Sequence, residues 1–205
     1  MRIFGILLLS IFVSCEEVDH PNSQFTVEID IGRDGFICSA HEYKKNIYLT
    51  SAHCVPAKHR NKIYLDRNAK VAKEIIVHPQ WDAHNVRYDL AIVKLGESDG
   101  IANFEIDEVF VLDEIESIVM QQGRKEVKKH RVEILQDDRF ATKDIQGALC
   151  KGNSGSPAYF YDGQDYILVG IASGITKESG GCNNGGYSIF ADLYGARDWI
   201  EENTY

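Results

Sequence analysis

The feature that most restricts how this chain can fold is a glycine-rich segment at residues 150–157, which reads CKGNSGSP. In it, Ser154 stands beside Gly155 and two residues after Gly152. Glycine adopts positive φ readily and allows close approach to the backbone, so the segment suits a tight turn that exposes a hydroxyl. The N–H groups of Gly152 and Ser154 would then converge on one point, as stabilisation of an oxyanion requires. Taken alone, the segment fits a plain turn between strands equally well.

Two upstream segments favour the catalytic interpretation. His53 lies in the segment TSAHC at 50–54, and Asp89 directly precedes the apolar stretch 90–95. A serine hydroxyl is a poor nucleophile at neutral pH and needs a base within hydrogen-bond reach. His53 can accept that proton and return it, while Asp89 would accept the other imidazole N–H. The alternatives are a structural histidine, one of seven in the chain, and a polar residue at a strand end.

Together the three segments resemble the chymotrypsin/trypsin family of serine proteases, in which His, Asp and Ser occur in this order. The resemblance runs from about residue 25 to residue 200. It implies catalytic roles for His53, Asp89 and Ser154, and an oxyanion hole formed by the N–H groups of Gly152 and Ser154. It also implies a set of substrate-binding residues: Ala148, Ser173, Gly174, Ile175 and Ser188. No metal or cofactor is expected, and His78 would support the fold.

The sequence departs from the family at the residue before the nucleophile. Asn153 stands where many members have an aspartate that pairs with a new N-terminal isoleucine after an activating cleavage. No Ile-Val-Gly-Gly segment occurs between Cys15 and Cys38 either. Because an unpaired buried aspartate is costly, loss of both partners together is physically consistent. We predict that no such cleavage occurs. The motif GNSGSP is similar to that of glutamyl-endopeptidase-like members, which also lack the ion pair.

The predicted specificity pocket has no fixed negative charge on its floor. Ala148 occupies the position at which trypsin-like members carry an aspartate. This predicts a preference for an uncharged residue before the scissile bond. The rival prediction, suggested by the nucleophile motif, is a preference for glutamate, with Lys151 or Lys177 as the positive charge. Lysines near a cleft are more often solvated.

The chain has five cysteines, an odd number that calls for explanation in an exported protein. The family resemblance pairs Cys38 with Cys54, and Cys150 with Cys182, which leaves Cys15. Both disulfides fit an oxidising compartment. A zinc site is the competing interpretation, but the sequence contains no Cys-x-x-Cys and no closely paired histidines.

Residues 1–15 have the pattern of a secretory signal. Arg2 precedes an apolar run at 3–13 that is too short to span a bilayer as a helix. Ser14 followed by Cys15 resembles a bacterial lipoprotein cleavage site, although Phe12 departs from that pattern. We therefore expect a secreted or cell-envelope protein (periplasm or surface), with lipidation of Cys15 favoured over ordinary cleavage nearby. The net charge of −9 argues against nucleic acid and anionic membrane surfaces as partners.

Short strands separated by turn signals predict an all-β fold. The family resemblance implies that this fold consists of two packed six-stranded antiparallel β-barrels with a C-terminal α-helix. We expect a signal at 1–15, a linker at 16–24 and a protease domain at 25–205, with barrels at about 25–100 and 109–193 and the helix at about 195–203. The predicted strands are 25–31, 36–40, 46–50, 63–65, 74–77 and 90–95, then 109–112, 117–121, 131–135, 158–161, 166–172 and 187–193.

The sequence thus predicts an exported, monomeric serine endopeptidase that hydrolyses protein or peptide substrates through an acyl-enzyme. The first alternative is a protease-like envelope protein that binds a partner without cleaving it. Such proteins usually lack a member of the triad, whereas all three residues are present here. The second is an unrelated esterase, whose nucleophile segment would read Gly-x-Ser-x-Gly. Residue 156 is a serine, so that segment is not present.

Overall fold

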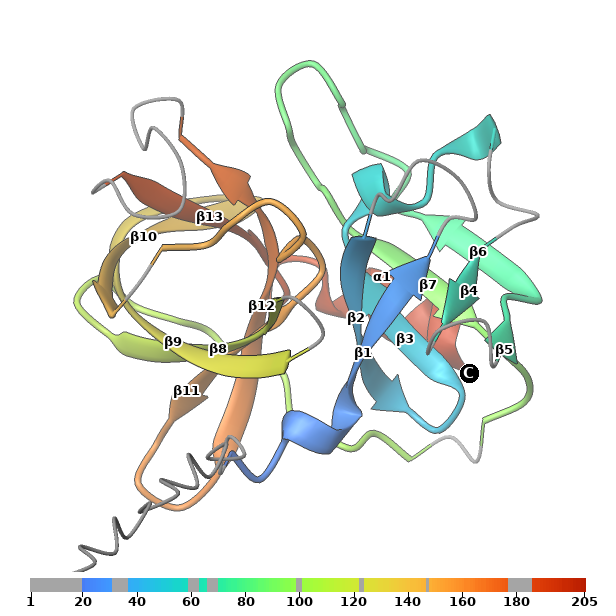
Figure 1. Cartoon of the computed structure of the whole chain (residues 1–205), viewed down its shortest axis with the longest axis horizontal. Coiled ribbons are helices and arrows are strands. Elements are labelled where there is room, and N and C mark those ends of the chain that lie inside the picture. The colour runs from blue at the N-terminus through green and yellow to red at the C-terminus, as the bar shows by residue number, and fades with distance from the viewer. Residues whose placement is uncertain are drawn as a thin grey trace, which may run out of the picture.

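The computed structural model describes residues 20–30, 37–58, 63–65, 70–98, 101–121, 124–146, 148–176 and 186–205. It consists of two antiparallel β units, seen side by side in Figure 1, and one short C-terminal helix. The predicted all-β fold class with a C-terminal helix is therefore confirmed. Of the two predicted six-stranded barrels, the second is a closed barrel, whereas the first is an open sheet of seven strands among the described residues. No helix among the described residues is long and apolar enough to cross a membrane.

The first unit is a curved sheet with the strand order β5-β4-β1-β2-β3-β7-β6. Its strands are β1 (Thr26–Asp30), β2 (Ile37–Lys44), β3 (Ile47–Thr50), β4 (Tyr64–Leu65), β5 (Lys70–Val71), β6 (Glu74–Val77) and β7 (Ala91–Lys94). Six of them correspond to predicted strands, and β5 is a two-residue addition. Two short 3-10 helices, η1 (Ser23–Phe25) and η2 (Ala52–Cys54), lie at the start of the unit and directly after β3.

The second unit is a closed six-stranded barrel with the order β10-β13-β12-β11-β8-β9. Its strands are β8 (Glu114–Gln121), β9 (Arg124–Gln136), β10 (Arg139–Gln146), β11 (Pro157–Tyr161), β12 (Tyr166–Ile175) and β13 (Tyr187–Asp192). The helix α1 (Arg197–Thr204) follows β13. Closure removes the exposed sheet edges that an open sheet would leave.

The prediction of a strand at 109–112 is wrong. Phe110 and Asp113 close a turn there, with the Asp113 N–H donating to the Phe110 carbonyl at 3.1 Å and the Phe110 N–H donating to Asp113 Oδ2 at 2.7 Å. Leu112 has a φ of 78°, outside the strand region. The apolar run VFVL fits a strand locally, but residues 110–112 are exposed.

Strand β10 was not predicted, and its inward side explains why. Thr142 and Asp144 follow Phe140 at alternate positions, and Thr142 faces the barrel core with no exposed surface. Asp144 reaches the buried His130 inside the barrel. Because polar side chains occupy inward positions, the segment lacks the alternation of apolar and polar residues that marks a half-buried strand.

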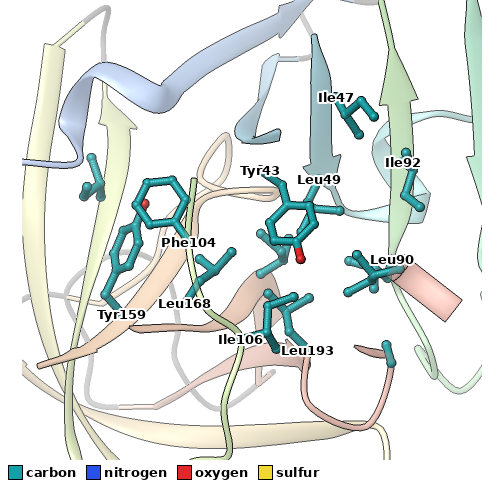
Figure 2. Close-up of a cluster of buried hydrophobic side chains, with 14 residues drawn as sticks. Tyr43, Ile47, Leu49, Leu90, Ile92, Phe104, Ile106, Tyr159, Leu168 and Leu193 are labelled. Carbon is teal, nitrogen blue, oxygen red and sulfur yellow. The ribbon is translucent and has the colours of Figure 1, made fainter. Parts of the chain in front are cut away.

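One hydrophobic cluster joins the two units. It includes Tyr43, Leu49 and Ile92 from the first unit, and Tyr159 and Leu168 from the second. Figure 2 shows these side chains gathered in one region between the strands. Ile200 of α1, with no exposed surface, packs into the same cluster. The two units therefore share a core, which holds the segments on either side of their junction in place.

Candidate active site

His53 and Asp89 form the best-defined polar contact at the junction. His53 lies in η2, directly after β3, and Asp89 lies two residues before β7. The His53 ring Nδ1 is 2.7 Å from Asp89 Oδ2, and the His53 backbone N–H donates to Asp89 Oδ1 at 3.0 Å. The imidazole side chain is 29% exposed, whereas the carboxylate is 1% exposed. The carboxylate therefore holds the ring from the buried side and leaves part of it open to solvent.

The second unit supplies a further hydrogen-bond donor to this carboxylate. The Ser173 hydroxyl, on β12, donates to Asp89 Oδ2 at 2.5 Å. This contact links β12 of the second unit to the aspartate of the first. Next to it, the Ser51 hydroxyl donates to the carbonyl of Ala172 at 2.6 Å. The buried carboxylate thus accepts three hydrogen bonds, which satisfy a charge that would otherwise be expensive to bury.

The segment around Ser154 is held against the first unit by its backbone. The Ser39 N–H, on β2, donates to the Ser154 carbonyl at 2.7 Å. On the other side, the Gly155 N–H donates to the Ala172 carbonyl at 2.7 Å. Ser39 follows Cys38, whose disulfide partner Cys54 follows His53. The three sequence segments therefore meet in one region, although they lie far apart in the chain.

Two glycines allow this turn to form. The Asn153 N–H donates to the Cys150 carbonyl at 2.9 Å, and Gly152, the third residue of that turn, has a φ of 98°. Positive φ at the third residue is the signature of a type II turn, in which glycine is favoured. Gly155 has a φ of 84°, and a Cβ there would lie 1.8 Å from the Ser39 carbonyl oxygen. No other residue fits at 155 without moving β2.

The family of the chain can be tested by comparison with known proteins. The protein-family model described as Trypsin matches residues 12–109 and 109–200. The chain belongs to the trypsin family. No curated protein matches it. The prediction of the family from three short segments is therefore confirmed.

In this trypsin-family chain, the residue before Ser154 is held by neutral groups. Asn153 is buried, and its side-chain Oδ1 accepts the Cys150 N–H at 2.7 Å. Its Nδ2 donates to the carbonyl of Met120, on β8, at 2.9 Å. Each half of the amide therefore has a partner, and no charged group is needed at this position.

The predicted substrate-binding residues lie on both sides of the nucleophile segment. Ala148 is buried directly before that segment, while Gly174 and Ile175 form the end of β12, with Ile175 exposed. Ser188, on β13, is fully buried. Its hydroxyl accepts the Leu149 N–H at 3.2 Å. The predictions that these residues and Ser173 bind substrate stay predictions, as does the role of Lys151. Lys177 lies outside the described residues.

Behind Ser188, a polar chain crosses the interior of the barrel, and the sequence did not reveal it. Ser188 Oγ donates to Asp144 Oδ1 at 2.8 Å, and the same oxygen lies 2.8 Å from His130 Nδ1. His130 Nε2 is 2.7 Å from the hydroxyl of Ser117. The four residues come from four strands and share no local motif, so only their pairing in space could identify them.

The disulfide between Cys38 and Cys54 is confirmed. Cys150 also takes part in a disulfide, and Cys182, its predicted partner, lies outside the described residues, as does Cys15. Cys38, Cys54 and His53 come within 4.8 Å of one another, a spacing that could suit a metal. Because both sulfurs are in the disulfide, they are not available as thiolate ligands.

His78 has a supporting position, as the family resemblance implies. Its ring stacks on Tyr88 with 4.8 Å between centroids and contacts Trp199 edge-on at 4.7 Å. Burial lowers its pKa, because desolvation disfavours the charged imidazolium. His78 therefore packs the segment before Asp89 against α1.

Proposed function

We propose that this trypsin-family protein is an exported serine endopeptidase with His53, Asp89 and Ser154 as its catalytic triad. Membership of the family supports hydrolysis of the serine-protease type. The observation that carries the finer assignment is the buried Asp89 carboxylate 2.7 Å from His53 Nδ1, beside the region where the Ser154 backbone is bound to β2. In this proposal the other ring nitrogen, Nε2, which lies 3.7 Å from Cys54 Sγ, accepts the proton of the serine hydroxyl.

The proposed reaction follows from these roles. His53 Nε2 takes the Ser154 proton as Oγ attacks the scissile carbonyl, and the negative oxygen is stabilised by the N–H groups of Gly152 and Ser154. The imidazolium, stabilised by Asp89, then gives its proton to the leaving amine, which leaves an acyl-enzyme. Water enters, and His53 repeats the proton transfer to release the acid and restore the serine hydroxyl.

We further propose that the site forms on folding, without an N-terminal isoleucine. The neutral, fully bonded Asn153 side chain supports this, because it anchors the nucleophile turn to β8 by hydrogen bonds alone. Export and lipidation at Cys15 are part of the same proposal. Mass spectrometry of the mature N-terminus tests these proposals, and we expect lipid on Cys15. If activity instead required a mature N-terminus inside the strand region, the proposal that the site forms without an activating cleavage would be contradicted.

The proposed specificity is for an uncharged residue before the scissile bond, because Ala148 brings no charge to the pocket floor. The rival preference for glutamate rests on the nucleophile motif. A peptide library separates the two proposals by the residue at which cleavage occurs. Cleavage mainly after Lys or Arg would contradict both.

A covalent probe tests the proposed chemistry directly. An organophosphonate should label the wild-type chain on Ser154, and Ser154→Ala should abolish labelling. We expect peptide hydrolysis to fall on the order of a millionfold in Ser154→Ala. The matched control is Ser156→Ala, two residues further on, where the hydroxyl is fully buried. Unchanged hydrolysis in Ser154→Ala would refute the assignment of Ser154 as the nucleophile. A wild type that neither hydrolyses peptides nor takes the label would favour a binding protein.

A further inference from the structure

The loop that leads into Asp89 is held in an unfavourable backbone conformation. Val86 has a φ of 54° and Tyr88 a φ of 50°. Left-handed φ is uncommon for residues other than glycine and is a genuine outlier for a β-branched side chain such as valine. Two such residues within three positions need contacts that outweigh their cost. Asp89 directly follows them.

Those contacts come from the turn between β9 and β10 in the barrel of the second unit, and from the first residue of β10. Asp138, which is 4% exposed, accepts the Tyr88 N–H on Oδ2 at 3.0 Å. Its Oδ1 accepts from Arg87 Nε at 3.3 Å and from Arg87 Nη2 at 3.1 Å. Arg139, the next residue, donates from Nη1 to the carbonyls of Asn85 and Val86, at 2.9 Å each. Every residue from 85 to 88 is therefore bound either to this turn or to the first residue of β10.

The turn is itself fixed to the barrel. The Asp192 N–H, at the end of β13, donates to the Asp138 carbonyl at 3.1 Å. On the loop side, the carbonyl of Tyr88 accepts the Leu90 N–H at 2.7 Å, across Asp89. A displacement of residues 86–88 would therefore move the backbone that carries the Asp89 carboxylate. The ion pair also raises the pKa of Arg87, mainly through its hydrogen bond to Asp138.

We infer that Asp138, with Arg87 and Arg139, is a positioning group that sets the Asp89 carboxylate against His53. This inference rests on the proposed function, in which Asp89 orients the catalytic imidazole. The first unit supplies both His53 and Asp89, but the second unit supplies the contacts that keep residues 85–88 in place. Asp138 and Arg139 therefore act through Asp89 and do not touch the substrate in this role.

The test replaces the ion pair and follows His53 directly. Asp138→Asn removes the charge at nearly constant size, and Arg87→Gln removes the guanidinium and leaves a shorter polar side chain. Arg131→Gln is the matched control, because it removes an exposed ion pair to Glu114 on the same barrel, with a 2.8 Å contact. In ¹⁵N-histidine-labelled protein, the low-field Nδ1–H resonance of His53 reports its bond to Asp89. The Nδ1–H of His130, bonded to Asp144, is an internal reference for folding.

We expect the His53 resonance to move or exchange faster in both variants, while the His130 resonance and the Arg131→Gln spectrum stay unchanged. Peptide hydrolysis should lose roughly tenfold or more in kcat, with KM within about twofold, because a small misplacement of catalytic groups is costly. Arg87→Lys should recover part of the loss, since both Arg87 nitrogens bind one oxygen, which a single ammonium can reach.

A double-mutant cycle separates positioning from simple loss of stability. In an Asp89→Asn background, Arg87→Gln should change kcat by no more than about twofold, because the carboxylate it positions is gone. Equal losses in both backgrounds, or a His53 resonance unmoved by Arg87→Gln and Asp138→Asn, would overturn the inference. If the wild type hydrolyses no peptide, but the His53 resonance changes as expected in Arg87→Gln and Asp138→Asn, the proposed function fails and the positioning role stands.

Discussion

At the scale of single residues, Asn153 shows how a neutral side chain can hold a position where a charge is common. The amide is buried, and its oxygen and nitrogen are each bonded to a backbone group. A neutral pair of this kind costs less to desolvate than a carboxylate, which would need a cation. The nucleophile turn is therefore anchored by groups that are present as soon as the chain folds.

Asn153→Asp should destabilise the protein by about 3–5 kcal/mol at pH 7, because it buries a charge and leaves the Met120 carbonyl without its donor. The loss relative to wild type should be smaller at pH 4, where a protonated carboxyl can donate again. Urea unfolding at both pH values measures it. The control is Asn203→Asp on α1, which removes a similar bond, to the Trp199 carbonyl, at a partly exposed site. Equal losses at both positions would contradict the argument.

At the scale of elements, the nucleophile turn and strand β2 are in direct backbone contact at Gly155. The Ser39 carbonyl, which the absent Cβ would strike, also accepts the Thr50 hydroxyl at 2.7 Å. The turn therefore packs onto a place where β2 and β3 are already joined. This close approach explains why the serine segment of the second unit reaches the histidine segment of the first.

Gly155→Ala should destabilise the protein by more than about 3 kcal/mol, because backbone atoms on both sides must move. Gly163→Ala is the control: Gly163 also has positive φ, 104°, but a Cβ there meets nothing within 4 Å. It should show only the backbone cost, about 1–2 kcal/mol. Thermal unfolding of the two variants compares them. Equal shifts would show that the contact with β2 does not matter.

At the scale of the whole molecule, the junction of the two units contains a buried histidine. His41, on β2, has no exposed surface and lies 4.7 Å from Phe104, ring to ring. The hydroxyl of Tyr159, on β11, is 3.2 Å from its Nε2. Desolvation lowers the His41 pKa to about 3. The imidazole must therefore be neutral for the two units to pack.

This burial predicts loss of stability in mild acid. Unfolding raises the His41 pKa from about 3 to its ordinary value near 6.5, so the unfolded chain binds the proton and stability falls as the pH drops below 6.5. Between pH 7 and pH 5 this one residue should remove roughly 2 kcal/mol of the free energy of unfolding. Denaturant unfolding at several pH values measures the slope.

The double variant His41→Phe with Tyr159→Phe should flatten this slope, since it removes the titrating group and the hydroxyl that pairs with it. Part of the slope should persist, because burial also lowers the pKa values of His20 and His78. A slope as steep as that of the wild type would show that His41 is not the group that titrates.

The sequence by itself was sufficient for the all-β class, the family and the Cys38–Cys54 disulfide. The all-β class follows from alternating apolar residues. The family follows from a resemblance carried by a glycine-rich turn and a histidine beside a cysteine, and the disulfide pairing follows from that resemblance. The absence of a charge at residue 153 could also be read directly from the sequence, because it depends on the identity of one residue. Patterns of this kind can be recognised from the sequence alone, because each depends only on residues that are close together in the chain.

Only the tertiary structure decided how distant segments pair. It made 109–112 a turn and formed β10, and it placed Asp144 and His130 together inside a barrel. It also placed Asp138 against the loop before Asp89, about 50 residues earlier in the chain. Such pairings depend on barrel closure and on the packing of one unit against the other. A buried polar side chain is tolerated only where those long-range contacts satisfy it, and nothing in its local sequence reports them.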